Sequence, residues 1–213
     1  MLCSESGTVG FPYRQKTIET MKIFLETERL ILRQLTEDDA SNLFELNSDP
    51  DVVRFTPEAN RPNDYAAIKT RTLPRYLAYY EKYKDYGFWA VIEKSSQEFI
   101  GWFLLRPAVE APYFDPALAH PSDIELAYRL RKASWGKGYA TEGAKALILK
   151  SFSELETQHI VAVALAANVV SIRVMEKVGL KLERRMMYEP LGQEIVMYAL
   201  SRDEFQPENY ATT

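Results

Sequence analysis

The stretch ELAYRLRKASWGKGYATEG at residues 125–143 decides the fold, because three structural signals follow one another in it. Residues 123–130 alternate apolar and polar side chains, which predicts a strand. Gly136 and Gly138 then interrupt the pattern, and from Ala140 onward apolar residues recur at helical spacing. The stretch therefore predicts a strand, a glycine turn and a helix in immediate succession.

The glycine turn is a candidate anion site. The first N–H groups of a helix have no partner within the helix, and the helix dipole favours negative charge there. Gly136, Gly138 and Ala140 are small, so they would leave these amides open to a phosphate. A tight turn that uses glycine only for its backbone geometry is the alternative. The spacing matches neither the mononucleotide P-loop nor the dinucleotide fingerprint, which needs a third glycine where this chain continues with Tyr139 to Thr141.

Strand and helix signals extend outward from this stretch in both directions. The expected strands are residues 29–35, 88–94, 98–107, 123–130, 159–165, 181–188 and 194–200. A helix is expected after Thr36, where Asp39 occupies the third position of a capping box. A second helix is expected within residues 61–87, disturbed at Pro74, and two more follow Gly138 and Asn168, the last ending at Gly179.

These elements predict one α+β domain, with a mostly antiparallel sheet and helices on both faces. The domain is expected at residues 22–205, between an N-terminal extension at residues 1–21 and a C-terminal tail at residues 206–213. A proline-rich loop at residues 107–122 is long enough to suggest a functional role.

Composition excludes several classes of protein. The 213 residues are 46% hydrophobic and carry a net charge of −4, which argues against disorder and against a dedicated nucleic-acid binder. No apolar run approaches the ~20 residues that span a membrane. Cys3 is the only cysteine, which fits a cytoplasmic location, and His120 and His159 are isolated, so no metal site is expected.

The stretch at residues 125–143, followed by NVVSIRVMEKVGL at residues 168–180, resembles the GNAT superfamily of acyl-CoA N-acetyltransferases. The segment LETERLILRQLTEDDA at residues 25–40 is similar to the branch of the ribosomal-protein-alanine N-acetyltransferases, the RimJ/RimL type. The resemblance covers residues 22–205 and implies a GNAT fold with a central sheet of about seven strands. It also implies acetyl-CoA as co-substrate.

The resemblance places the six-residue family signature on consecutive positions of the glycine turn. Those positions are Trp135, Gly136, Lys137, Gly138, Tyr139 and Ala140. Trp135 departs from the basic or amide residue that is usual at the first position. The resemblance implies that the backbone amides of residues 136–141, from Gly136 to Thr141, hold the pyrophosphate of acetyl-CoA.

Direct transfer requires a neutral amine, a polarised thioester carbonyl and a stabilised thiolate. The resemblance points to a backbone N–H of Leu126, Ala127 or Tyr128 for the carbonyl. Glu125 is the candidate base, since an acidic residue recurs at this position in the branch. The alternatives for Glu125 are a solvated strand carboxylate or a partner for Arg129. Glu142 is a weaker candidate, because the helix dipole explains a carboxylate in a first helical turn.

The leaving thiolate lacks the proton donor found in much of the superfamily. Many members carry a Tyr seven residues after the Asn of the last motif, and here Asn168 plus seven is Met175. The branch has a Ser at the position of Ser171, able to hydrogen-bond the sulfur. Asn168 is expected both to cap its helix and to contact the pantetheine arm. A first-turn serine and an ordinary cap are the structural alternatives.

The expected acceptor is a primary amine, with a peptide or protein N-terminus favoured over a small molecule. An α-amine has a pKa of about 7.7–8.0 against about 10.4 for lysine, so more of it is neutral at physiological pH. Tyr113 and Phe114 are candidates for the acceptor side. A non-catalytic acyl-CoA-binding or sensing protein is the alternative function, and a monomer or homodimer is expected.

Overall fold

The computed structural model describes residues 22–56, 59, 62–111, 120 and 122–210. One sheet runs through this part of the chain in the order β1-β2-β3-β4-β5-β6-β8-β7. Its strands are β1 (Ile23–Glu26), β2 (Leu30–Gln34), β3 (Gly87–Glu93), β4 (Phe99–Pro107), β5 (Asp123–Leu130), β6 (His159–Leu165), β7 (Lys181–Tyr188) and β8 (Gln193–Ser201). Neighbouring strands are antiparallel except β5 and β6, which are parallel. The seven predicted strands and the mostly antiparallel sheet are confirmed, and the expected extension at residues 1–21 lies outside the described residues.

The strand β1 raises the count from about seven to eight. It is four residues long and joins β2 through a turn in which the Thr27 N–H donates to the Leu30 carbonyl at 2.9 Å. The Phe24 ring stacks on Trp89 of β3 with 3.8 Å between centroids. Pairing and ring contact hold this short segment as a strand, whereas four residues contain too little alternation to predict one.

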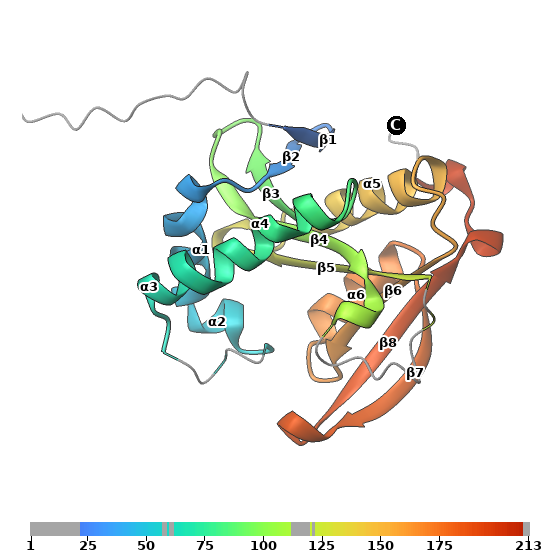
Figure 1. The fold of residues 1–213 in the computed structure, drawn as a ribbon. Coiled ribbons are helices and arrows are strands. Elements are labelled where there is room, and N and C mark those ends of the chain that lie inside the picture. The colour runs from blue at the N-terminus through green and yellow to red at the C-terminus, as the bar shows by residue number, and fades with distance from the viewer. Residues whose placement is uncertain (1–21, 57–58, 60–61, 112–119, 121, 211–213) are drawn as a thin grey trace, which may run out of the picture.

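Six α-helices of the described residues flank the sheet, together with short 3₁₀ turns (Figure 1). They are α1 (Ala40–Ser48), α2 (Pro50–Val53), α3 (Tyr65–Ala67), α4 (Leu73–Lys82), α5 (Tyr139–Ser153) and α6 (Val169–Lys177). A π-helical segment, Ile68–Thr72, separates α3 from α4 just before Pro74. Proline lacks an N–H and its ring crowds the carbonyl of the preceding turn, so the predicted disturbance of the helix is confirmed.

Two hydrophobic clusters place helices on both faces of the sheet. In the larger one, Leu147 and Ile148 of α5 and Met175 of α6 pack on the inner strands. In the second, Leu43 of α1 and Tyr76 of α4 pack on the opposite face. Figure 1 shows α4 crossing the central strands on that face. The predicted two-sided arrangement is confirmed.

The C-terminal segment packs onto the first cluster. The Tyr210 side chain is 7% exposed, and its hydroxyl donates to the Val178 carbonyl at 2.7 Å. Its ring lies 5.1 Å from that of Phe205, which in turn lies 4.7 Å from Phe152 of α5. The expected domain limit at residue 205 therefore falls short of a core contact at Tyr210.

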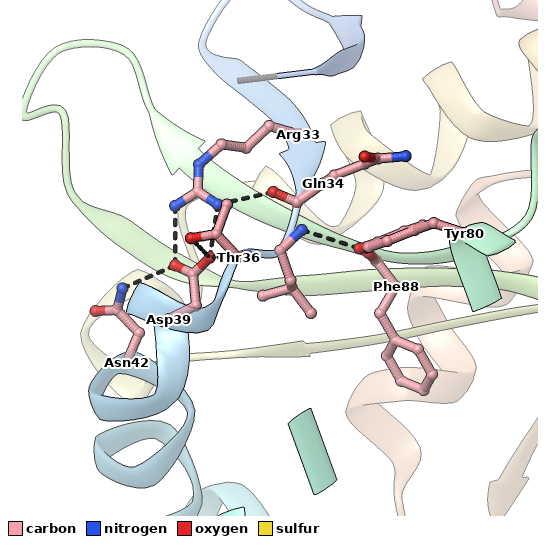
Figure 2. A network of polar contacts seen from close by, with 8 residues as sticks. Arg33, Gln34, Thr36, Asp39, Asn42, Tyr80 and Phe88 are labelled. Atoms are coloured by element: carbon pink, nitrogen blue, oxygen red, sulfur yellow. Dashed lines mark hydrogen bonds and ion pairs between the residues drawn. The ribbon is translucent and has the colours of Figure 1, made fainter. Parts of the chain in front are cut away.

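A buried ion pair joins β2 to α1 (Figure 2). The Arg33 guanidinium donates to both oxygens of Asp39 at 2.7 and 2.9 Å. Asp39 also accepts from the Thr36 N–H at 2.8 Å, which is the predicted capping box, and from Asn42 Nδ2 at 3.1 Å. Although burial alone would raise the pKa of Asp39, hydrogen bonds and charge from Arg33, with further hydrogen bonds, hold it below its ordinary value. This network fixes the entry into α1.

Candidate active site

The strands β5 and β6 diverge after three residue pairs. Pairing is recorded for Asp123, Ile124 and Glu125 of β5, the last opposite Val161, although both strands continue. β5 remains paired with β4 from Ile124 to Leu130, whereas beyond Glu125 the backbone groups of β5 that face β6 have no partner in that strand. The divergence opens the sheet at its centre.

Two cavities meet at this opening. A narrow cavity of about 130 Å³ lies toward α6, and a wide cavity of about 360 Å³ lies toward α4. Their linings share Ala127 and Tyr128 of β5 and Val163 and Ala164 of β6. Two molecules that entered from opposite faces of the sheet would therefore come together between these strands.

The narrow cavity contains most of the side chains predicted near the thioester. Leu126, Tyr128, Asn168, Ser171 and Met175 all line it. The Asn168 Oδ1 accepts from the Ser171 N–H at 3.3 Å, so the predicted cap of α6 is confirmed. Asn168 and Ser171 are half-buried, whereas the Met175 side chain is 6% exposed and packs in the core.

The side chains of Tyr128 and Ser171 interact through their hydroxyl groups within this cavity. Burial raises the pKa of the Tyr128 hydroxyl, and a hydrogen bond with Ser171 partly offsets the rise. The pair joins the divergent half of β5 to the first turn of α6. Sequence reasoning named Tyr128 for its backbone and overlooked its hydroxyl, since only the packing of α6 against β5 brings Ser171 beside it.

The glycine turn lies at the far end of β5 and leads into α5. Gly136 and Gly138 have φ angles of +74° and +84°, and α5 begins at Tyr139. A Cβ at Gly136 would point into open space, and one at Gly138 would have only the Arg29 guanidinium nearby, at 3.4 Å. The backbone of the turn is exposed, as the predicted anion site requires.

Side chains on both sides hold the turn in this conformation. The Trp135 indole Nε1–H donates to the Leu130 carbonyl at 2.9 Å, and the Arg29 guanidinium donates to the Lys137 carbonyl at 2.9 Å. The Tyr139 side chain is 7% exposed, and its hydroxyl donates to Glu93 at 2.9 Å. The side chains of Trp135 and Tyr139 are therefore structural anchors of the turn.

Glu142 joins the first turn of α5 to the turn between β1 and β2. Its carboxylate accepts from the Arg29 backbone N–H at 3.0 Å, from the Arg29 guanidinium at 2.6 Å and from the Thr27 hydroxyl. Although burial would raise the pKa of Glu142, these hydrogen bonds hold it below its ordinary value. Glu142 does not line either cavity among the described residues, which agrees with its weak standing as a base.

Glu125 lines the wide cavity, where it is paired with an arginine of the neighbouring strand. Its side chain is buried, and Arg106 Nε donates to its Oε2 at 2.6 Å. The register of β4 and β5 places Arg106 directly opposite Glu125. The alternative of a solvated carboxylate is therefore wrong, and the ion pair seen at Glu125 is with Arg106, whereas Arg129 donates to Asn47 Oδ1 at 2.6 Å.

Glu110 is the second carboxylate in the wall of the wide cavity. Hydrogen bonds from Lys82, Tyr83 and Tyr79 hold its pKa below the ordinary value against the effect of burial. Tyr79 also hydrogen-bonds Arg106, so the two carboxylates belong to one polar wall. Sequence reasoning missed this wall because Arg106 lies in an otherwise apolar strand whose register was unknown. The acceptor-side candidates Tyr113 and Phe114 lie outside the described residues.

The comparison with protein families identifies this arrangement. The family model of the acetyltransferase (GNAT) domain matches residues 29–181. The chain belongs to the GNAT family. It is therefore a GNAT-family N-acetyltransferase, and the stretch at residues 125–143 lies entirely within the matched region.

Relatives and solved structures agree with the family. The uncharacterized N-acetyltransferase YoaA of Bacillus subtilis is 29% identical over 169 residues, which cover 78% of this chain and 88% of that protein. The aminoglycoside acetyltransferase AAC(6')-Ib in complex with coenzyme A has a TM-score of 0.66 at 22% identity, over 83% of this chain and 96% of that one. RimL, a ribosomal alpha-N-protein acetyltransferase in complex with coenzyme A, has a TM-score of 0.68 at 15% identity, over 86% of this chain and all of that one. At these identities the two structures establish the shared fold.

The described residues contain neither a candidate metal site nor a candidate membrane-spanning helix. No group of three or more His, Cys, Asp or Glu side chains is arranged there to hold a metal ion. Within the same residues, no helix is both long and apolar enough to cross a membrane.

Proposed function

We propose that this GNAT enzyme transfers an acetyl group from acetyl-CoA to a primary amine by direct attack within a ternary complex. The observation that carries the proposal is the opening between β5 and β6, where the narrow and wide cavities meet at Tyr128 and Ala164. A thioester in the narrow cavity and an amine in the wide one would meet at this point. No covalent enzyme intermediate is required.

The glycine turn is proposed to hold the pyrophosphate. Its exposed backbone and the N-terminus of the 15-residue helix α5 supply N–H groups and a favourable dipole from Gly136 to Thr141. The open space that a Cβ at Gly136 would enter fits this role. Asn168, at the N-terminus of α6 in the narrow cavity, is placed to contact the pantetheine arm.

The thioester carbonyl and the leaving sulfur would be served from β5 and α6. Acetyl-CoA supplies the acetyl group already activated as a thioester. The backbone of β5 at Leu126, Ala127 and Tyr128, which has no partner in β6, can donate an N–H to its carbonyl oxygen. The Ser171 hydroxyl, beside that of Tyr128 in the narrow cavity, can donate a hydrogen bond to the leaving thiolate, a role for which Met175 has no hydroxyl.

Glu125 is the proposed base. Its carboxylate lies in the wall of the wide cavity on the strand that also carries the unpaired backbone groups. The ion pair with Arg106 orients it, so it can receive the ammonium proton directly or through one water.

A peptide N-terminal α-amine is the favoured acceptor, because its lower pKa leaves more of it neutral than a lysine side chain. Assignment to the RimJ/RimL branch is part of this proposal. It is supported by the segment at residues 25–40 and by the likeness in fold to RimL.

Two measurements test the proposal together. Calorimetry should detect binding of CoA, and release of free thiol should detect consumption of acetyl-CoA when peptides, polyamines and amino acids are offered in turn. Mass spectrometry of the consumed amine should show the added acetyl group. Binding of CoA with no acetylated product from any amine would favour the non-catalytic acyl-CoA-binding alternative, whereas no binding of CoA would overturn both.

A further inference from the structure

The wide cavity has an unusual charge distribution for a site that must attract an ammonium group. Among the described residues, five charged side chains line it, namely Arg75 of α4, Arg106 of β4, Glu110, and Glu125 and Arg129 of β5. Three positive and two negative charges leave a formal net charge of +1, although the whole chain carries −4. The wall is therefore poorly suited to retain a polycation.

Both carboxylates of this wall already have cationic partners. Glu125 is paired with Arg106 at 2.6 Å, and Glu110 is paired with Lys82 and hydrogen-bonded by Tyr83. A second cation would have to compete with these internal partners for the same oxygens. The two glutamates therefore provide little attraction for additional amino groups of an acceptor.

Arg75 is the guanidinium of the wall with room for a ligand. It is exposed and lies on the face of α4 that carries Tyr76 and Tyr79 into the same cavity. Its recorded contact is with the Tyr76 ring, 5.5 Å from the centroid, and no described residue forms a hydrogen bond or ion pair with it. A planar guanidinium that is exposed and has no hydrogen-bond partner among the described residues is suited to bind a carboxylate through two parallel hydrogen bonds.

Aromatic and aliphatic side chains form the rest of the wall near Arg75. The Tyr76 ring stacks on Phe88 with 3.5 Å between centroids, and Trp102 meets Phe88 edge-on at 5.2 Å. Leu104 and Ile195 extend this apolar surface. The cavity of about 360 Å³ is large enough for an acceptor of amino-acid to dipeptide size.

We infer that the acceptor is a primary amine that carries a carboxylate and an apolar body, with Arg75 as the residue that binds the carboxylate. This inference rests on the proposed function and names its substrate class. The amine lies at the β5–β6 opening, the apolar body lies against Tyr76, Phe88 and Trp102, and the carboxylate contacts α4. A polycationic acceptor, such as an aminoglycoside or a polyamine, is a poor fit.

The test compares matched acceptors and matched variants. Alanyl-phenylalanine and its C-terminal amide differ in the terminal carboxylate, and the tripeptide amides Ala-Glu-Phe and Ala-Gln-Phe differ in a side-chain carboxylate. Arg75→Gln should lower kcat/KM about fivefold for the charged member of at least one pair, and leave the neutral member within twofold. Arg71→Gln, an exposed arginine that does not line the cavity, should change neither.

The pair that responds identifies the source of the carboxylate, a free C-terminus or an acidic side chain. An equal effect of Arg75→Gln on both members of both pairs, or no effect, would overturn the inference. Faster acetylation of kanamycin or spermidine than of every peptide would overturn it too.

A binding measurement separates this inference from the proposed function. In the presence of CoA, calorimetry should show the N-acetylated form of the charged peptide in at least one pair binding about fivefold more tightly than its neutral counterpart, with the difference abolished by Arg75→Gln. If this preference appears while no amine is acetylated, the proposed function fails and the carboxylate site stands. If peptides are acetylated without any preference for a carboxylate, the function stands and the inference fails.

Discussion

The pairs Arg33–Asp39 and Arg106–Glu125 each have a buried carboxylate, and they differ in what surrounds it. Arg33 and Asp39 join β2 to α1, and both oxygens of Asp39 are occupied by donors from Arg33, Thr36 and Asn42. Arg106 and Glu125 face each other across β4 and β5, and their carboxylate lies in the wall of a cavity. The first pair holds two elements of the fold together, whereas the second pair faces the space where a substrate is proposed to bind.

The contrast shows that burial alone does not separate a structural ion pair from a functional one. Asp39 is 2% exposed and Glu125 is 0% exposed, so their accessibility is practically equal. What differs is the neighbouring space, since Asp39 packs among its hydrogen-bond donors and Glu125 borders about 360 Å³ of cavity. Changes in the first region should reduce stability, and changes in the second should reduce activity.

The largest effect is expected from Asp39→Asn. The amide would present an NH₂ group to donors that now meet an acceptor, and Arg33 would remain buried without its counter-charge. We expect the free energy of unfolding at pH 7 to fall by about 3 kcal/mol in urea denaturation. Glu37→Ala, an exposed neighbour, should change it by less than about 0.5 kcal/mol. A loss below about 1 kcal/mol for Asp39→Asn would show that the Arg33–Asp39 pair contributes little to the stability of the fold.

The same chemical change in the cavity, Glu125→Gln, should act on the reaction instead. We expect kcat to fall about 100-fold with little change in KM for acetyl-CoA, because a base acts on the acceptor. The loss should shrink as pH rises, since the amine then deprotonates without help. Glu110→Gln is the control in the same wall and should cost less than tenfold. A pH-independent loss, or none, would make Glu125 a structural residue like Asp39.

Gly138→Val tests the backbone that is proposed to hold the pyrophosphate. A branched side chain at φ +84° would crowd the turn, and CoA affinity should fall tenfold or more in calorimetry with the fold retained. Gly192→Val places the same side chain at φ +60° in the turn between β7 and β8, as a control for backbone strain. Equal CoA affinity in the folded Gly138→Val protein and in wild type would refute the site.

Ser171→Ala tests the proposed hydrogen bond to the leaving thiolate in the narrow cavity. Loss of one hydrogen bond to a charged sulfur should lower kcat about tenfold, equivalent to about 1.4 kcal/mol, and less for acyl donors whose thiols have a lower pKa. Met175→Leu exchanges one buried apolar side chain for another and should barely alter the rate. If Met175→Leu lowers kcat and Ser171→Ala does not, Ser171 is not the hydrogen-bond donor to the leaving thiolate.

The smallest effect is expected at Glu142, which joins two parts of the fold beside the glycine turn. Its lowered pKa means that its ionised form stabilises the folded state above the unfolded pKa, and that this contribution is lost as pH falls through the folded pKa. Glu142→Gln should cost about 1 kcal/mol at pH 7. The difference in unfolding free energy from wild type should begin to shrink as pH falls below the ordinary glutamate pKa of about 4.3, and should vanish once the folded-state carboxylate is protonated. A difference that stays constant while the folded protein takes up this proton would contradict this origin.

Much of the fold could be predicted because its signals are local. The capping residues Thr36 and Asn168, the helix-disturbing Pro74 and the alternation within each long strand act over a few residues and do not depend on distant partners. The short strand β1 could not be predicted, since it depends on pairing with β2 and on the Phe24–Trp89 stack.

The candidate site divides in the same way. The sequence by itself determined the strand–glycine–helix order from Glu125 to Gly143 and the cap at Asn168, because glycine geometry and helix ends are properties of the local chain. Only the tertiary structure decided that Arg106 is the partner of Glu125 and that β5 and β6 part after three residue pairs. It also decided that three arginines line one cavity, because strand register and helix packing join residues that are far apart in the chain.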